Sequence, residues 1–354
     1  MSAFNKDLFL TADKVRKNLR NIIRKRPSFL LAEILLTYNC TQHCLQCNIP
    51  ERAGDDNVIS VNNCLDLLDR LARYGTQGIV LSGGEVTSHK DYGKIIEYAA
   101  SKKFIYRHVL SNLYFSEPKM ADFISLILEN RFNLTTSFDG MNEIADKIRG
   151  GKNVASIVKN NMEFLDEENT RLGRPIRTTA NIVLSQLNLY QVPEMISYLN
   201  ELGWLINVDI YRNSSINHNQ VDEMVITDFE LLAEILRYLK NVKDLITPQW
   251  LLDGYVNYLK NDFEKACPYL HNPGLGSKFF IQPNGDVIVC IGDPIGNLFK
   301  QTPDEIFDSE AWQKKIREFE LCPGCWNTCY TPVARMSKYF DWKESRKILK
   351  LVKD

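Results

Sequence analysis

The sequence predicts an α/β protein, in which parallel strands alternate with helices and a smaller cysteine-rich region follows. Short buried apolar runs recur over about the first 215 residues, and segments with helical spacing separate them. A β-hairpin signal and a group of cysteines appear near the carboxyl end. With 354 residues, 44% of them hydrophobic, the chain can bury a sizeable core in one large or two modest domains.

Six predicted strands follow one another along the chain. The first, 29–37, is an almost unbroken apolar run, which is typical of a buried strand. The later ones lie at 78–82, 108–112, 134–140, 181–185 and 206–211. Because a helical segment separates each strand from the next, we expect them to run parallel in one sheet.

Three cysteines lie on the loop that follows the first predicted strand. Cys40, Cys44 and Cys47 are spaced Cys-x3-Cys-x2-Cys. Thiolates on one short loop can face a single centre, and soft sulfur ligands select iron–sulfur clusters or zinc. A structural zinc site takes four protein ligands, whereas this loop offers three and no evident fourth. One corner of the metal centre is therefore left open for a substrate or cofactor.

The second predicted strand runs directly into Gly83, Gly84 and Glu85. Glycines let a backbone come close to a ligand, and a carboxylate matches an ammonium group, so this segment is a candidate binding loop. We expect a side chain at position 84 to obstruct that approach. In the fourth predicted strand, Ser137 and Asp139 alternate onto one face.

These segments, in this order, resemble the radical S-adenosylmethionine (radical SAM) superfamily over about residues 29–215. The cysteine loop, the segment Gly83–Glu85 and the segment Asp146–Gly150 carry the resemblance. It implies a partial (β/α)6 TIM-like barrel, with the active site at the carboxyl ends of the strands. It also implies that Cys40, Cys44 and Cys47 bind one [4Fe–4S] cluster, whose fourth iron is chelated by S-adenosyl-L-methionine.

The resemblance further implies a set of cofactor-binding residues. The methionine end of the cofactor is expected at Gly83–Glu85, and its ribose near Ser137 and Asp139, with Asn112 at the end of the third predicted strand. One position departs from the family pattern. The residue before the third cysteine is usually aromatic and packs near the adenine, but here it is Gln46. Adenine is then held by an amide and other apolar groups, or Leu45 takes part of the packing.

A second group of cysteines lies in the carboxyl-terminal region. Cys267 precedes a predicted hairpin at 279–290, in which Asn284-Gly285 is the turn and Cys290 closes the second strand. A helical stretch at 303–319 leads to Cys322, Cys325 and Cys329. Five cysteines within about sixty residues predict a second metal site. A structural zinc site built from four of them is an alternative.

This region resembles the SPASM/twitch extension of radical SAM enzymes, through Pro283–Val287 and Cys290. Two auxiliary clusters need about seven or eight cysteines, so five imply one auxiliary [4Fe–4S] cluster. The implied ligands are Cys267, Cys290, Cys322 and Cys325. Cys329 is then surplus, a replacement ligand, or a catalytic thiol that returns hydrogen to a substrate radical.

The expected organisation has five parts. These are an amino-terminal basic helix (1–27), the barrel (28–220), a helical connection (221–264), a small α/β auxiliary-cluster domain (265–335) and a carboxyl-terminal helix (336–354). The basic amino-terminal helix either contacts an anionic membrane surface or a partner, or caps the bottom of the barrel.

The resemblance implies a reaction type but only a broad substrate class. Reductive cleavage of S-adenosyl-L-methionine gives a 5′-deoxyadenosyl radical, which abstracts a substrate hydrogen. Oxidation, cross-linking or epimerisation of a natural-product or peptide substrate is expected to follow, with flavodoxin or ferredoxin as electron donor. A non-catalytic iron–sulfur electron carrier or a zinc-stabilised binding module is the alternative. A carrier, however, has no need of the Gly83–Glu85 segment.

Composition limits the binding partners and the cellular compartment that we expect for this chain. The net charge of −1 gives no general attraction to nucleic acid. No apolar stretch approaches the about 18–20 residues of a membrane span, and the amino terminus lacks a signal-peptide pattern. Nine cysteines therefore favour metal ligation in a reducing cytoplasm over disulfides. Cys64 lies on a predicted helix that Ser60 caps, and we expect its side chain to pack in the protein core.

Overall fold

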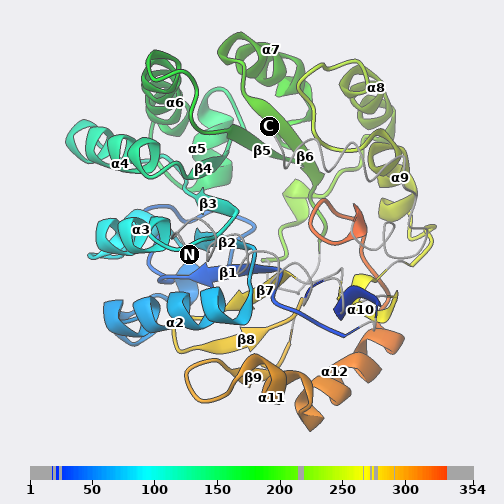
Figure 1. The fold of residues 1–354 in the computed structure, drawn as a ribbon. Helices are drawn as coiled ribbons and strands as arrows, with labels where there is room; N and C mark the ends of the chain where they lie inside the picture. Colours follow the sequence, from blue (N-terminus) through cyan, green and yellow to red (C-terminus); the bar gives the residue numbers. More distant parts are fainter. Residues whose placement is uncertain are drawn as a thin grey trace.

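The computed structural model describes residues 18, 21–23, 26–213, 219–265, 267–271, 273–274, 278–290 and 292–332. Its strands form one curved, open sheet in the order β6-β5-β4-β3-β2-β1-β7-β8-β9 (Figure 1). The strands are β1 (Leu31–Leu35), β2 (Gly78–Ser82), β3 (Tyr106–Leu110), β4 (Asn133–Ser137), β5 (Thr178–Leu184), β6 (Leu205–Ile210), β7 (Lys278–Ile281), β8 (Asp286–Ile288) and β9 (Gly296–Asn297).

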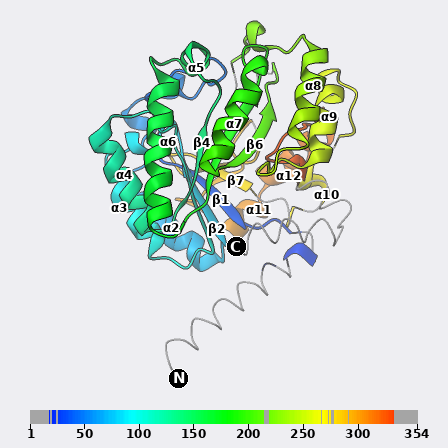
Figure 2. The same cartoon turned by 90° about the horizontal axis from the view of Figure 1, so that it is seen from above.

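Strands β1 to β6 are all parallel, and a helix follows each of the first five before the next strand begins. Helices α2, α3, α4, α6, α7 and α8 lie on the outer side of the curved sheet, whereas α5 lies at the carboxyl ends of the strands (Figure 1, Figure 2). The helices are α2 (Val61–Tyr74), α3 (Tyr92–Ala100), α4 (Glu117–Glu129), α5 (Glu143–Arg149), α6 (Val154–Arg171), α7 (Val192–Leu202), α8 (Phe229–Leu239), α9 (Gln249–Leu259), α10 (Pro268–His271), α11 (Pro303–Phe307) and α12 (Glu310–Leu321). The architecture is a partial barrel, as predicted.

The two faces of the sheet differ in polarity because side chains alternate along each strand. On the outer face, Ile34, Leu81, Val109, Leu134 and Ile206 are fully buried beneath the helices. The inner face carries polar side chains that bond to one another. These include Ser82 to Glu33 (2.7 Å), His108 to Thr135 (2.7 Å) and Asn207 to Asn181 (2.9 Å). The apolar core therefore lies outside the sheet, and the inner wall of the barrel is polar.

Helix α2 shows why the outer layer forms where it does. The Ser60 hydroxyl accepts a hydrogen bond from the Asn63 amide at 3.2 Å, which caps the first turn. One face of the helix is buried against the sheet, through Cys64, Leu67, Leu68 and Leu71. The predicted cap and the predicted core position of Cys64 are confirmed.

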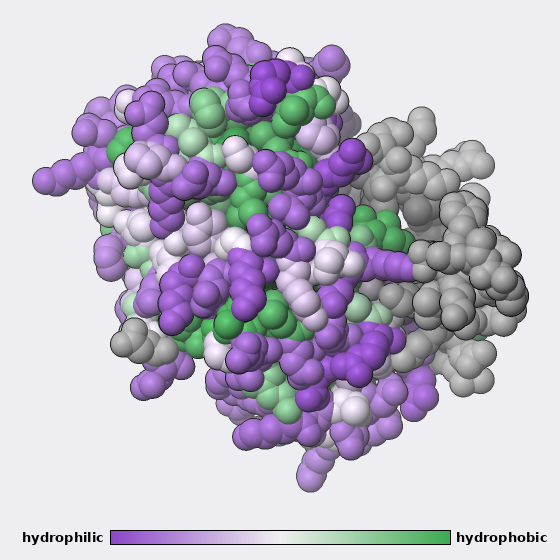
Figure 3. Space-filling model, turned by 60° about the vertical axis from the view of Figure 1, so that its left-hand side comes forward, coloured by the Kyte–Doolittle hydropathy of each residue, from purple (hydrophilic) through white to green (hydrophobic). Residues whose placement is uncertain are grey.

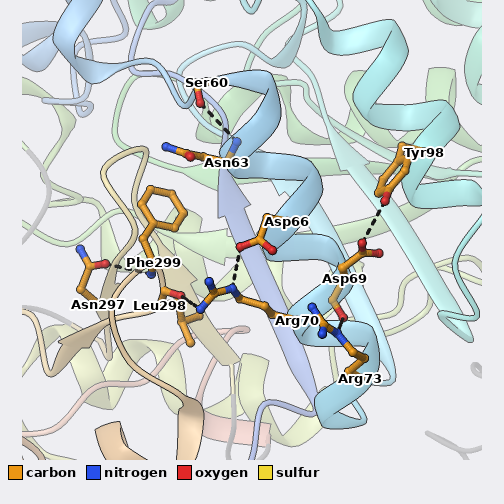
Figure 4. A network of polar contacts seen from close by, with 10 residues as sticks. All are labelled: Ser60, Asn63, Asp66, Asp69, Arg70, Arg73, Tyr98, Asn297, Leu298 and Phe299. Atoms are coloured by element: carbon orange, nitrogen blue, oxygen red, sulfur yellow. Dashed lines mark hydrogen bonds and ion pairs between the residues drawn. The ribbon is translucent and has the colours of Figure 1, made fainter.

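The carboxyl-terminal hairpin is also confirmed, since β7 and β8 pair antiparallel around Gly285. The structure adds a feature that the sequence did not predict, because β7 joins the barrel sheet in parallel beside β1. The hairpin region therefore shares the barrel sheet. A polar network ties it to α2 as well, in which Arg70 bonds both Asp66 and the carbonyl of Leu298 (3.3 Å) (Figure 4).

Some predicted boundaries change. Strand β4 ends at Ser137, so Asp139 lies beyond it in the following loop. The predicted helical stretch at 303–319 is two helices, because Thr302 caps α11 and Ser309 caps α12. Residues 336–354 and most of 1–27 lie outside the described residues, so the two predicted terminal helices stay predictions.

Figure 3 shows a mainly hydrophilic face, with apolar side chains in separate small patches. Among the described residues, every helix is too short or too polar to cross a bilayer.

Candidate functional site

The three loop cysteines lie together at the carboxyl end of β1. The thiols of Cys40, Cys44 and Cys47 are half-buried, and each interacts electrostatically with the others. Burial raises the pKa of all three, that of Cys44 to about 11. A positive centre that replaces the thiol protons would remove this cost, so these thiols suit a metal cluster.

The Gly83–Glu85 segment holds the start of that loop through its backbone. The Gly84 amide donates to the Thr37 carbonyl at 2.7 Å, and the Glu85 amide donates to the Asn39 carbonyl at 2.9 Å. A Cβ atom at Gly84 would overlap the Asn39 carbonyl oxygen and lie 2.6 Å from that of Tyr38. The loop backbone therefore already requires glycine here, and the predicted approach of a ligand stays a prediction.

The carboxylate of Glu85 is buried and bonded to protein groups. Its Oε1 accepts from the Thr87 amide and the Ser111 hydroxyl, both at 3.0 Å, and its Oε2 accepts from the Asn112 amide at 2.7 Å. Burial raises the pKa of Glu85, and these donors oppose that shift. The carboxylate thus joins the ends of β2 and β3.

Asn112 connects the end of β3 to the cysteine loop. Its Nδ2 donates a hydrogen bond to the Thr41 hydroxyl at 3.0 Å and another to the Cys40 sulfur at 3.7 Å. Its Oδ1 accepts from the Tyr114 amide at 2.9 Å. This predicted site residue therefore touches the first cysteine directly.

At the end of β4, Ser137 is half-buried and Asp139 is buried. The Asp139 carboxylate accepts from Arg149 at 3.1 Å and from the Val183 amide at 2.9 Å. Arg149 also donates to the Gln42 side chain at 3.0 Å, between the first two cysteines. Sequence reasoning noted the segment Asp146–Gly150 only as part of the family pattern and missed Arg149 as a site residue.

Several buried polar atoms of the loop have no hydrogen-bond partner within the described part of the chain. They are Tyr38 Oη, Gln42 Nε2, Gln46 Oε1 and Asn48 Oδ1. Buried polar atoms are nearly always paired, so these four suit a bound polar ligand. Three thiols beside unsatisfied polar atoms fit an iron–sulfur cluster together with a polar cofactor.

Four of the five carboxyl-terminal cysteines also lie together. The charges of Cys267, Cys290, Cys322 and Cys325 interact in every pairwise combination. Burial raises the pKa of Cys267, Cys290 and Cys325, that of Cys290 to about 12. The Gly324 amide donates to the Cys322 sulfur at 3.4 Å. This is the predicted auxiliary set. Among the described residues, no three Cys, His, Asp or Glu side chains converge as the ligands of a single metal ion would.

Cys329 has other neighbours as well. The residue is exposed, and its thiol interacts with Cys290 and with the charges of Lys278, Asp209 and Glu33 on the inner wall. The neighbouring Thr328 bonds Asp209 through its amide (3.0 Å) and its hydroxyl (2.8 Å). Cys329 therefore lies between the four-cysteine group and the polar inner wall of the barrel.

Comparison with known families agrees with this arrangement. Residues 34–199 match the model of the radical SAM superfamily, and residues 273–330 match the SPASM model, described as an iron–sulfur cluster-binding domain. The first match contains the three loop cysteines, and the second contains Cys290, Cys322, Cys325 and Cys329.

Two relatives of known function share less than a quarter of their aligned residues with this chain. The chain is 24% identical to PqqA peptide cyclase of Bradyrhizobium diazoefficiens, over 75% of this chain and 66% of that protein. It is 23% identical to the subtilosin biosynthesis protein AlbA of Bacillus subtilis, over 88% of this chain and 70% of that protein. The chain thus covers about two thirds of the length of these relatives.

Among solved structures, Streptococcus suis SuiB bound to its precursor peptide SuiA superposes with a TM-score of 0.65. The identity is 15%, and the match covers 86% of this chain and 71% of SuiB. At this identity the likeness shows the fold. The chain therefore contains a radical SAM domain and a SPASM-type iron–sulfur cluster-binding domain, which imply S-adenosyl-L-methionine, a [4Fe–4S] cluster and auxiliary iron–sulfur clusters as its cofactors.

Proposed function

We propose that this chain is a radical SAM enzyme that modifies a peptide. The observation that carries the proposal is that three interacting thiols and several unsatisfied polar atoms lie on one loop at the carboxyl ends of parallel strands, beside a polar inner wall. S-Adenosyl-L-methionine bound to a reduced cluster supplies an organic radical that abstracts hydrogen from an unactivated carbon.

The residues of the chain hold and orient these groups. Cys40, Cys44 and Cys47 bind the cluster, and the backbone of Gly83 and Gly84 fixes the loop on which they lie. The unsatisfied amide oxygens of Gln46 and Asn48 accept hydrogen bonds from the cofactor. Exchange of water for fixed protein dipoles in such a site protects reactive intermediates from side reactions.

Glu85, Asn112, Ser137 and Asp139 complete the proposed cofactor site. Glu85 and Asp139 act through their neighbours, because their carboxylates are bonded to protein donors. Asn112 touches both the loop and Cys40, so it supports the cluster. Ser137 is half-buried at the end of β4, where a ribose hydroxyl can reach it.

The carboxyl-terminal region supplies two further elements. Cys267, Cys290, Cys322 and Cys325 bind the auxiliary cluster, which adds redox capacity near the inner wall. Cys329 is the candidate hydrogen donor to a substrate radical. Its S–H bond breaks as a substrate C–H bond forms, and one electron from a flavodoxin- or ferredoxin-type donor, together with one proton from solvent, then restores the thiol. That step corresponds to epimerisation, whereas net loss of hydrogen corresponds to oxidation or cross-linking.

A peptide is the favoured substrate because the named relatives include a peptide cyclase and a bacteriocin biosynthesis protein, and SuiB is seen with a precursor peptide. The inner wall agrees with this choice. It offers the Lys278–Glu33 ion pair (2.7 Å) together with the amides of Asn181 and Asn207, which suit the polar backbone of a peptide. We place the enzyme in the reducing cytoplasm, where free thiols persist.

The test is formation of 5′-deoxyadenosine by protein reconstituted with iron and sulfide under anaerobic conditions, with dithionite and S-adenosyl-L-methionine. We expect cleavage by the wild type and none by the Cys40→Ala, Cys44→Ala, Cys47→Ala triple variant, which should still bind iron in its carboxyl-terminal region. Cys64→Ala is the matched control, because it removes a buried thiol of α2 and should keep activity. Cleavage by the triple variant would refute the assignment.

A further inference from the structure

Helix α5 presses its carboxyl end against the cysteine loop. The Leu45 amide donates to the Ile148 carbonyl at 2.9 Å. Gly150 then ends the helix in the left-handed region (φ 65°), and a Cβ atom there would overlap the His43 carbonyl. These contacts fix the last helical residue, Arg149, beside the loop that carries the three cysteines.

The guanidinium of Arg149 is held at two points and is nearly inaccessible to water, with 11% of its side chain exposed. One anchor is Asp139, at 3.1 Å, which is itself bonded to Val183. The other is Gln42, at 3.0 Å, which lies between Cys40 and Cys44. A charge fixed in this way cannot move away when the charge of its surroundings changes.

This charge is close to the cysteine loop. The Arg149 guanidinium bonds Gln42, which stands between Cys40 and Cys44 in the chain, and the adjacent Ile148 carbonyl bonds the Leu45 amide, so the charge lies against the loop that carries the thiols. Arg149 bonds this loop directly, whereas Asp139 is bonded to Arg149. The pair therefore presents its positive member to the loop, although its formal charges cancel.

We propose that Arg149 is a positioning residue that raises the reduction potential of the loop cluster, by stabilising its reduced, more negative form. This inference rests on the proposed function in one respect, that Cys40, Cys44 and Cys47 bind the cluster. A reduced cluster carries one additional negative charge, and a fixed positive charge in a site of low dielectric constant favours that state. Asp139 weakens the effect and also orients the guanidinium.

The test is an EPR-monitored redox titration of the anaerobically reconstituted full chain, following the signal that S-adenosyl-L-methionine perturbs. Arg149→Gln should lower the potential, so that the ratio of reduced to oxidised cluster at a fixed potential falls about tenfold. Arg149→Lys keeps the charge and should restore most of that ratio. Asp139→Asn removes the opposing charge and should shift the potential upward.

Arg237→Gln is the matched control, because Arg237 is exposed on the outer helix α8. It should leave the potential unchanged. An unchanged potential in Arg149→Gln with full iron content would overturn the proposal, and so would a downward shift in Asp139→Asn. If Arg149→Gln loses the cluster, the potential of Asp139→Asn tests the proposal instead. An upward shift supports the proposal and a downward shift refutes it.

These results are separate from a failure of the proposed function. That failure is cofactor cleavage by the triple cysteine variant, whereas the potential is measured on a cluster that is present.

Discussion

At the scale of single residues, Gly84 shows how a sequence pattern can be correct for a different reason. A Gly-Gly-Glu segment after a strand predicts close approach of a ligand. In the structure the close approach is between two backbones, since the Gly84 amide bonds the Thr37 carbonyl and a Cβ atom would overlap Asn39. The glycine thus shapes the cysteine loop, and the approach of a cofactor to this segment stays a prediction.

Gly84→Ala should therefore destabilise the fold and reduce iron binding by the loop. The added Cβ meets backbone, which cannot rotate away, and overpacking of this kind costs about 1–3 kcal/mol. Gly93→Ala in α3 is the control, because its Cβ would meet only a Leu126 side chain at 3.8 Å. Urea unfolding of both variants, with iron counting, checks this. Normal iron content in Gly84→Ala with weakened cofactor binding would favour the ligand interpretation.

Residues that act through long-range pairs are those that the sequence could not identify. Asn112 and Asp139 were expected near a cofactor because of the family resemblance. In the structure Asn112 bonds the cysteine loop directly, and Asp139 is linked to it through Arg149. Arg149 was not identified, because its pairing with Gln42 spans 107 positions and depends on how α5 docks. Gln46 stood out as a departure, but only the structure shows that its amide oxygen lacks a partner among the described residues.

At the scale of elements, the alternation of strands and helices was predictable, because burial on one face of each helix and the period of the strands are local signals. The observed ends of the strands differ from the predicted ends by a few residues. The pairing of β7 with β1 was not predictable, since it joins positions far apart in the chain and is stabilised by the Lys278–Glu33 ion pair. The break between α11 and α12 had a signal in Ser309, which caps the second helix.

The polar inner wall of the sheet predicts a pH dependence centred on β3. His108 is buried between Tyr106 (2.8 Å) and Thr135, and burial lowers its pKa to about 3, with Lys278 adding to the shift. The unfolded chain binds the proton from about pH 6.5, so stability is full above that pH and falls as the pH decreases toward 3.

At pH 4.5 the loss from this group is about 2–3 kcal/mol, since each pH unit between the two pKa values costs about 1.4 kcal/mol. His108→Gln should lack this loss. The measurement is the difference in unfolding free energy between the wild type and His108→Gln, at pH 7.5 and at pH 4.5. An equal decrease in both proteins would show that other groups carry the acid sensitivity.

At the scale of the whole molecule, the carboxyl-terminal segment connects two parts of the barrel that the strands leave apart. Thr328 bonds Asp209 at the end of β6. Trp326 donates to the Leu251 carbonyl on α9 at 2.8 Å and packs on Gly254, where a side chain would overlap the indole ring. On the other side, the hairpin continues the sheet beside β1. The docked segment therefore carries Cys322, Cys325 and Cys329 between these two parts of the barrel.

This arrangement bears on which cysteine, Cys267 or Cys329, is the fourth ligand of the auxiliary cluster. Cys267 interacts with Cys290, Cys322 and Cys325, whereas Cys329 interacts with Cys290 and with the charges of Lys278, Asp209 and Glu33 on the inner wall. Cys267→Ala should lose the auxiliary iron, and Cys329→Ala should retain it. Iron and sulfide counting on each variant, in a background that keeps the loop cysteines, makes the comparison direct.

The same Cys329→Ala variant tests the thiol as a hydrogen donor. It should still form 5′-deoxyadenosine, because the loop cluster is untouched. With a peptide that the wild type epimerises in D2O, the variant should no longer place deuterium at the modified carbon. Loss of auxiliary iron in Cys329→Ala but not in Cys267→Ala would assign Cys329 as the fourth ligand, and a thiol bound to iron has no hydrogen to give.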